Sequence, residues 1–261
     1  MARRLLRSRK AGPIRSRLVL AIAAALALVA GVALLARGTA DKARSDGAPV
    51  GLFTSLAILW NEEPDVASML KSAEEPHWAR AVLKPRGGIA PLDSLAAPGG
   101  RGPLDRIGRL VVAQPRPLSP DENVALDAWV RGGGRLLLLA DPALTAESAF
   151  AIGDPRRPQA VVLISPILKR WGLDLTFDEG QTFAERTIAV EGVPVPVNLP
   201  GRFAVRDAKA CTATGEGLVA TCRIGKGLVT AVADAAVLDR DDPDGSRRKA
   251  FEGLLDRAFA D

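Results

Sequence analysis

The chain has 261 residues, of which 35 are Lys or Arg and 30 are Asp or Glu, giving a formal charge of +5. Residues 1–17 hold seven of the basic residues and no acidic one, so 28 basic and 30 acidic residues remain, a charge of −2. A nucleic-acid-binding domain carries its basic excess on the folded surface, so nucleic acid is excluded as a partner. The 48% of hydrophobic residues is ordinary for a globular protein. The length fits one globular domain of about 200 residues plus a leader.

An uncharged stretch from Leu18 to Ala36 follows the basic arm. At about 1.5 Å per residue, a helix of this length spans the roughly 30 Å hydrocarbon core of a membrane. We therefore expect a transmembrane anchor, with a leader cleaved after Gly38-Thr39-Ala40 as the alternative. The positive charges before this stretch are expected to hold the N-terminus in the cytoplasm; they are Arg3, Arg4, Arg7, Arg9, Lys10, Arg15 and Arg17. The prediction is a single-pass protein of a bacterial inner membrane, with residues 37–49 as a linker and residues 50–261 as a periplasmic domain.

The first part of that domain gives mostly weak signals. Val50 to Leu59 is apolar and rich in strand formers, which predicts a buried strand. Pro64 to Ser72 has Pro and Asp in its first turn and an apolar stripe, which predicts a short helix. The Pro- and Gly-rich residues 76–106 give only a strand near Ala81–Leu83 and a turn at Leu92–Leu95.

A strand–helix–strand unit follows, and it is the clearest pattern in the sequence. Arg109 to Ala113 and Arg135 to Ala140 are apolar strands. Between them, Ser119 is expected to cap a helix that has Pro120 at its first position and ends at Gly132-Gly133-Gly134. Strands that are apolar throughout are typical of a parallel sheet covered on both faces.

The second half of the domain continues with shorter elements. We predict a helix at Ser165–Trp171, a strand at Leu173–Phe177, antiparallel hairpins over Thr182–Cys222, a strand at Leu228–Ala233 and a last helix at Ser246–Phe259. The predicted fold class is α/β: an open, mostly parallel doubly wound sheet with an antiparallel hairpin region, preceded by one transmembrane helix.

Cys211 and Cys222 bracket one of these hairpins. If Glu216-Gly217 forms its turn, the strand register places the two cysteines opposite each other, near the reach of a disulfide. An oxidising compartment favours the bond. Free thiols, or metal or redox chemistry, are the alternatives.

Acidic residues end two of the predicted strands. Asp141 and Asp234 stand at the carboxyl edge, where open α/β sheets bind ligands, and they are the candidate ligand-facing pair. Their alternative role is to cap turns at the strand ends. The acidic run from Asp239 to Gly245 lacks the spacing of a calcium loop, and the Gly-rich turns lack that of a phosphate loop. We therefore expect a solvated turn at Asp239–Gly245, with a loose cation site as the alternative, and we expect no cofactor and no metal ion.

Three segments carry a resemblance to a known group. They are Leu110–Pro142 (LVVAQPRPLSPDENVALDAWVRGGGRLLLLADP), Ser165–Leu175 (SPILKRWGLDL) and Gly225–Leu238 (GKGLVTAVADAAVL). Together they resemble the extracytoplasmic domain of gliding-motility-type (Gld-like) ABC-transporter accessory proteins and related membrane-anchored domains with a class I glutamine-amidotransferase-like fold. The resemblance implies that fold, with ABC permease and ATPase subunits as partners.

The same resemblance raises the question of catalysis. An amidotransferase has a nucleophilic Cys at the turn that holds Asp141-Pro142 here, and a nucleophile needs a base within hydrogen-bond reach. The single histidine, His77, lies far away in the sequence and is expected at the surface. The expected function is a non-catalytic accessory or binding domain of an ABC-type transport system. The alternatives are a periplasmic hydrolase using Asp141 and Asp234, and a soluble periplasmic ligand-binding protein.

Overall fold

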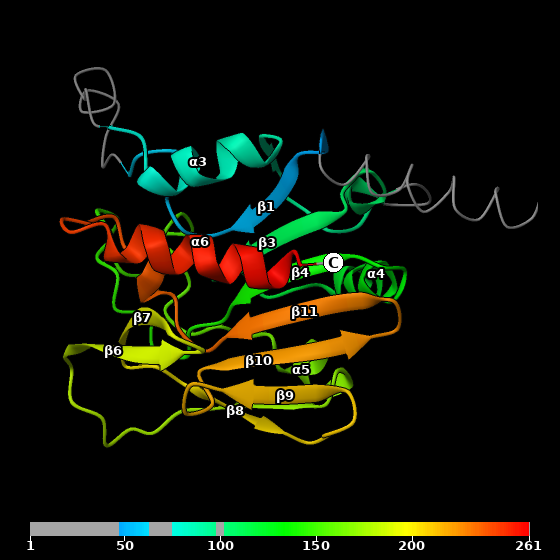
Figure 1. The fold of residues 1–261 in the computed structure, drawn as a ribbon. Coiled ribbons are helices and arrows are strands. Elements are labelled where there is room, and N and C mark those ends of the chain that lie inside the picture. Colours follow the sequence, from blue (N-terminus) through cyan, green and yellow to red (C-terminus); the bar gives the residue numbers. More distant parts are fainter. Residues whose placement is uncertain (1–46, 63–74, 98–101, 261) are drawn as a thin grey trace, which may run out of the picture. The chain divides into compact units, whose positions relative to one another are not determined.

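The computed structural model describes residues 47–62, 75–97 and 102–260, and every structural statement below concerns these residues. Their centre is a seven-stranded sheet with the order β2-β1-β3-β4-β11-β10-β9 (Figure 1). The strands are β1 (Val50–Thr54), β2 (Ile89–Pro91), β3 (Arg109–Ala113), β4 (Arg135–Leu139), β5 (Leu173–Thr176), β6 (Glu185–Val190), β7 (Val193–Asn198), β8 (Arg202–Val205), β9 (Cys211–Thr214), β10 (Val219–Ile224) and β11 (Gly227–Val232). The helices are α3 (Trp78–Leu83), α4 (Pro120–Arg131), α5 (Ser165–Arg170) and α6 (Ser246–Ala258), with short 3-10 turns η1 (Lys84–Arg86), η2 (Pro103–Arg106) and η3 (Ala236–Leu238).

The predicted strand–helix–strand unit is confirmed. β3 and β4 pair in parallel, with Leu110 opposite Leu136, and α4 connects them. The helix starts with a capping box: the Ser119 hydroxyl accepts a hydrogen bond from the Glu122 amide at 3.2 Å, and the Glu122 carboxylate accepts one from the Ser119 amide at 2.9 Å. These bonds satisfy two amides that the helix itself leaves without a partner, so the sequence fixes where α4 begins.

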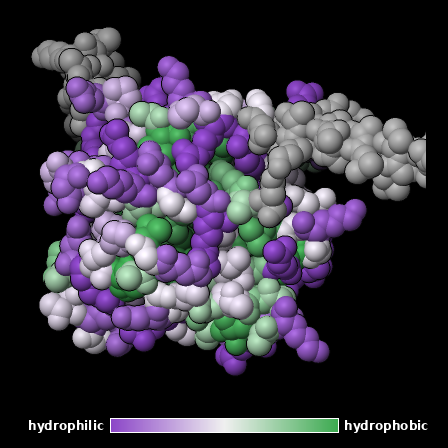
Figure 2. All heavy atoms as spheres, in the orientation of Figure 1, coloured by the Kyte–Doolittle hydropathy of each residue, from purple (hydrophilic) through white to green (hydrophobic). Residues whose placement is uncertain are grey.

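Helices cover both faces of the sheet. α3 and α6 contact each other on one face, and α4 and α5 contact each other on the other (Figure 1). α6 buries Phe251, Leu254 and Leu255, and it contacts β4 and β11. Hydrophilic side chains cover much of the face on which α6 lies, with smaller apolar areas between them (Figure 2). The core is therefore the apolar sheet between two helical layers.

The predicted fold class needs correction. In the seven-stranded sheet four strand pairings are parallel and two are antiparallel, so this sheet is mixed, with its antiparallel part at β9, β10 and β11. The pairs β5–β8 and β6–β7 form two further antiparallel sheets. The hairpin β9–β10 does not form a separate region, because β10 pairs with β11 and extends the main sheet. β2 and β9 remain as the two sheet edges, so the sheet is not a closed barrel.

Several predictions concern residues outside the described ones. The basic arm 1–17, the span 18–36, the linker up to residue 46 and the whole of the helix predicted at residues 64–72 lie there. Among the residues that the structure describes, no helix has both the length and the apolar character needed to cross a membrane.

Two local predictions in the first part are wrong. Ala81–Leu83 belongs to α3 and not to a strand. The His77 side chain caps this helix by accepting a hydrogen bond from the Ala79 amide. The strand predicted over Val50–Leu59 ends at Thr54, where turns begin. The apolar residues after it, such as Ile58, are buried without belonging to a strand, which is why hydrophobicity alone extended the strand too far.

The predicted disulfide is present. Cys211 and Cys222 are bonded with an S–S distance of 2.00 Å. They lie opposite each other in the β9–β10 pairing, in the predicted register. Glu216 and Gly217 in the connecting turn have φ angles of 57° and 86°. Such left-handed angles are typical of the tight turns that join hairpin strands.

Candidate functional site

Four adjacent strands of the sheet are followed by polar residues at their carboxyl ends. Ser55 follows β1, Gln114 follows β3, Asp141 follows β4 and Asp234 follows β11. The order of these strands brings together residues that are up to 179 positions apart in the sequence. This row of polar groups lies at the edge where open α/β sheets bind ligands.

Gln114 links the two halves of the row. It is fully buried and has a left-handed φ of 42°. Its side chain accepts a hydrogen bond from the Asp141 amide at 2.9 Å and donates to the Asp141 carbonyl at 3.1 Å and the Gln159 carbonyl at 2.6 Å. The Ser55 hydroxyl donates to the Gln114 carbonyl. Sequence reasoning missed Gln114, although it is the first polar residue after the apolar run that forms β3.

The predicted pair Asp141 and Asp234 is fully buried, with 0% and 1% exposure. The Asp141 carboxylate accepts hydrogen bonds from the amides of Ala143 and Ala235, at 2.8 and 3.1 Å. The Asp234 carboxylate accepts from the amides of Ala236 and Asn198, at 2.6 and 3.0 Å. Both side chains therefore cap turns at the strand ends, which is the alternative role considered for them.

Burial also changes the acidity of these two groups. It raises the pKa of Asp141 to about 6, although the two backbone hydrogen bonds act in the opposite direction. It raises the pKa of Asp234 well above its ordinary value, and the negative charge of Asp141 adds to the effect. Carboxyl groups with raised pKa values can hold a proton near neutral pH, as a general acid must.

His77 does not lie at the surface as predicted. It is 6% exposed; its Nδ1 accepts from the Ala79 amide at 3.1 Å, and its Nε2 lies 3.0 Å from the Leu238 carbonyl oxygen. Desolvation lowers the pKa of the imidazole. His77 therefore caps α3 and joins it to η3, through a contact with Leu238, 161 positions further along the chain.

An amidotransferase-type catalytic centre is absent from the described residues. The turn after β4 holds Asp141 and Pro142, and both cysteines are bonded to each other. Within the described ranges, no group of three or more His, Cys, Asp or Glu side chains is placed to hold a metal ion.

A cavity of about 550 Å³ opens at the Ser55 end of the polar row. Its wall includes the end of β1 with Ser55, the segment after β3 and the loop between β4 and α5. We call it the switch-point cavity, because the chain leaves β1 toward β2 and leaves β3 toward β4, on opposite sides. Its lining residues are Phe53, Thr54, Ser55, Trp60, Asn61, Asp93, Arg116, Phe150, Pro155, Arg156, Arg157 and Gln159. Ligands of open α/β sheets bind where the strand order reverses in this way.

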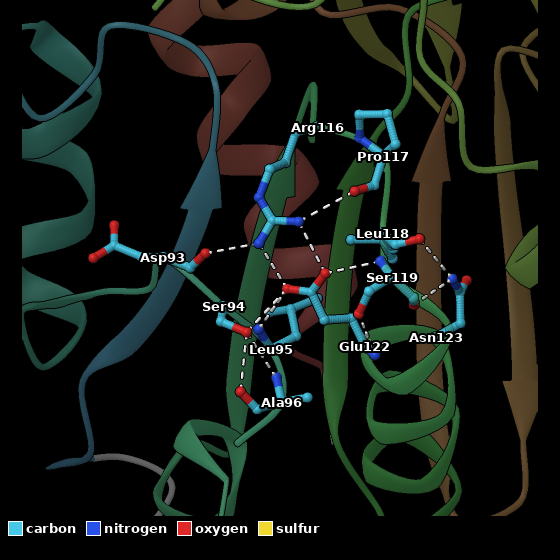
Figure 3. A network of polar contacts seen from close by, with 10 residues as sticks. All are labelled: Asp93, Ser94, Leu95, Ala96, Arg116, Pro117, Leu118, Ser119, Glu122 and Asn123. Carbon is cyan, nitrogen blue, oxygen red and sulfur yellow. Dashed lines mark hydrogen bonds and ion pairs between the residues drawn. The ribbon is translucent and has the colours of Figure 1, made fainter. Parts of the chain in front are cut away.

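A polar network fixes one wall of the cavity (Figure 3). The Arg116 guanidinium donates two hydrogen bonds to the Glu122 carboxylate, at 2.8 and 2.9 Å, and one to the Asp93 carbonyl at 2.9 Å. It also lies 5.0 Å from the centre of the Phe53 ring. The arginine lowers the pKa of Glu122 to about 2. The side chain of Arg116 is thus held in one position by α4, β1 and the segment at Asp93.

No known protein-family profile matches this chain, and no curated protein matches it either. Similar solved structures include an exo-β-1,4-mannosidase from Opitutaceae bacterium strain TAV5, at 19% identity and a TM-score of 0.48, covering 81% of this chain and 36% of the mannosidase. A β-galactosidase from the haloarchaeon Halorubrum lacusprofundi matches at 19% identity and a TM-score of 0.44, covering 81% of this chain and 30% of the enzyme. The cytoplasmic protein STM3548 from Salmonella typhimurium matches at 12% identity and a TM-score of 0.46, covering 79% and 97%.

The comparisons lend no support to the expected role as a non-catalytic accessory domain of an ABC-type transport system. The similar structures named above include two glycoside hydrolases, and none of the three is described as a transport accessory protein or an amidotransferase. This chain spans only about a third of the length of each hydrolase. At these identities and TM-scores the similarity assigns no activity.

Proposed function

We propose that the domain binds a small molecule in the switch-point cavity. The observation that carries this proposal is the position of the cavity, at the carboxyl ends of β1 and β3 where the strand order reverses. Its volume of about 550 Å³ suits a small ligand. Three aromatic rings and several hydrogen-bonding side chains line it, a combination typical of small-molecule sites.

A fragment screen by ligand-observed NMR on the full-length protein tests the proposal. Trp60 lines the cavity and is 44% exposed, so Trp60→Ala removes an aromatic wall with little effect on the core. We expect fragments that bind wild type to lose at least about tenfold in affinity in this variant. Phe183→Ala is the matched control, because Phe183 is 69% exposed and does not line the cavity. Fragments that bind Trp60→Ala as well as wild type contradict the proposal.

Hydrolysis by Asp141 and Asp234 is the second candidate. The raised pKa values of both carboxyl groups favour it, because a protonated carboxyl can donate to a leaving group while an ionised one activates water. Full burial of both side chains is the observation against it. The test is a screen of chromogenic esters and glycosides with wild type, Asp141→Asn and Asp256→Asn, which alters an exposed carboxylate. Activity that is retained in Asp256→Asn and lost in a folded Asp141→Asn establishes the hydrolase.

We also propose that the domain works in an oxidising compartment such as the periplasm. The buried disulfide between Cys211 and Cys222 supports this location, because cytosolic thiols are kept reduced. Rapid acid quenching of native cells followed by thiol alkylation is the test. We expect both cysteines to be protected from alkylation before reduction and modified after it, and free thiols in the untreated sample contradict the proposal.

A further inference from the structure

Three guanidinium groups line the switch-point cavity, and they differ in how their charges are balanced. Arg116 is paired with the buried Glu122. Arg156 is paired with Asp154, with N–O distances of 3.0 and 2.7 Å. Arg157 has no carboxylate within ion-pair distance in the part of the chain that the structure describes. Among the three, Arg157 is therefore the guanidinium that forms no ion pair with a described carboxylate.

The remaining contacts of Arg157 leave most of its donors available. Its Nη1 donates to the Phe150 carbonyl at 2.5 Å, the one side-chain hydrogen bond that it makes among the described residues. A guanidinium has five N–H donors in a planar fork that matches a carboxylate or phosphate. Because Arg157 is half-buried at the cavity wall, its charge is less screened by solvent than that of an exposed arginine.

The loop that carries Arg157 is held in place by its own contacts. The guanidinium of Arg156 lies 4.2 Å from the centre of the buried Phe150 ring. The Asp154 carboxylate accepts from the Arg156 amide at 2.9 Å, and the Asp154 carbonyl accepts from the Arg157 amide at 3.0 Å. A cation on an ordered loop binds an anion with a smaller loss of conformational entropy than one on a loose loop.

The rest of the lining indicates what accompanies the anionic group. Trp60 presents a partly exposed indole, on which a flat ring can lie. Asp93 also lines the cavity. The hydrogen bonds to Glu122 raise the pKa of the Arg116 guanidinium, and the negative charges of Glu122 and Asp93 add to this effect. An anionic ligand group would therefore be repelled at the Arg116 wall, and the Arg157 wall is the more favourable place for it.

We propose that the ligand of the switch-point cavity is an organic anion, a carboxylate or phosphate monoester, whose charged group pairs with Arg157 and whose ring lies on Trp60. This inference rests on the proposed binding function.

Isothermal titration of the full-length protein with three probes of similar size tests the inference. The probes are phenyl phosphate, benzoate and the neutral benzyl alcohol. We expect at least one of the two anions to bind at least about tenfold more tightly than benzyl alcohol, and the stronger of them identifies phosphate or carboxylate as the preferred group. Arg157→Gln should weaken that anion at least about tenfold and leave benzyl alcohol unchanged. Arg223→Gln is the matched control, because Arg223 is exposed on β10 and lines no part of this cavity.

The outcomes separate the inference from the proposed function. If benzyl alcohol binds as tightly as both anions, or Arg157→Gln leaves anion binding unchanged, the inference is overturned. The binding function then still stands, provided that Trp60→Ala weakens the neutral probe. If neither these probes nor the NMR fragments bind in a manner that depends on Trp60, the binding function itself is overturned.

Discussion

The raised pKa of Asp141 makes the stability of the domain depend on pH in a way that one substitution can expose. Burial raises this pKa from 3.8 to about 6. A carboxyl whose pKa is higher in the folded protein than in the unfolded chain stabilises the fold. This contribution is fully present below pH 3.8 and is lost as the pH rises through about 6. A difference of about 2 pH units corresponds to about 3 kcal/mol. About 2 kcal/mol of it is lost between pH 4.5 and 7.5, because the unfolded carboxyl is already largely ionised at pH 4.5.

Asp141→Asn removes this dependence, because the amide is neutral at every pH in the range. The variant retains an oxygen that can accept from the Ala143 amide, but its NH₂ group then faces the Ala235 amide, which loses its acceptor. That loss costs about 1–3 kcal/mol at any pH. We therefore expect the substitution to be less destabilising at pH 7.5 than at pH 4.5, by about 2 kcal/mol. Asp234 adds to the difference in the same direction, since the charge of Asp141 raises its pKa.

Urea unfolding of wild type and variant at both pH values, followed by tryptophan fluorescence, measures this difference. His77 has a lowered pKa and contributes stability that grows as the pH rises, but both proteins contain it and its effect cancels. Glu122, whose pKa is about 2, loses its contribution only at lower pH. The control is Asp256→Asn, whose carboxylate is 71% exposed. Equal destabilisation by Asp141→Asn at the two pH values, within about 0.5 kcal/mol, refutes the reasoning.

Three further predictions concern the stability of the fold, each measured by urea unfolding at pH 7. Glu122→Gln should lower the free energy of unfolding by about 3 kcal/mol, because the carboxylate accepts hydrogen bonds from both Arg116 and the Ser119 amide at the start of α4. A decrease of less than about 1 kcal/mol argues against the network in Figure 3. Replacing Cys211 and Cys222 together by Ala should cost about 3 kcal/mol, since the bond closes a loop between residues 11 positions apart, and an unchanged midpoint contradicts this. Gly227→Ala should lower the free energy of unfolding by about 3 kcal/mol, because a Cβ there meets a carbonyl oxygen of α4 at 2.0 Å. In the control Gly108→Ala, where a Cβ has nothing within 4 Å, the free energy of unfolding should change by less than about 0.5 kcal/mol.

Local patterns predicted several elements of this fold. The apolar run at Arg109–Ala113 and the Ser119 cap gave a strand and a helix start with correct bounds, because burial periodicity and capping act within a few residues of the chain. The pairing of Cys211 with Cys222 followed from the hairpin register, which depends only on the turn between them. Patterns failed where a distant segment decides, as at Ala81–Leu83, which local hydrophobicity assigned to a strand and which forms part of α3.

By itself, the sequence determined the β3–α4–β4 unit, the disulfide register and the candidate carboxylates Asp141 and Asp234. The tertiary structure alone decided what those carboxylates do, because the strand order places them side by side and buries them with backbone partners. It also brought Trp60, Arg116 and Arg157 to one cavity at the reversal of strand order. No short-range pattern connects these three residues, since their proximity depends on the order in which β1, β3 and β4 pair.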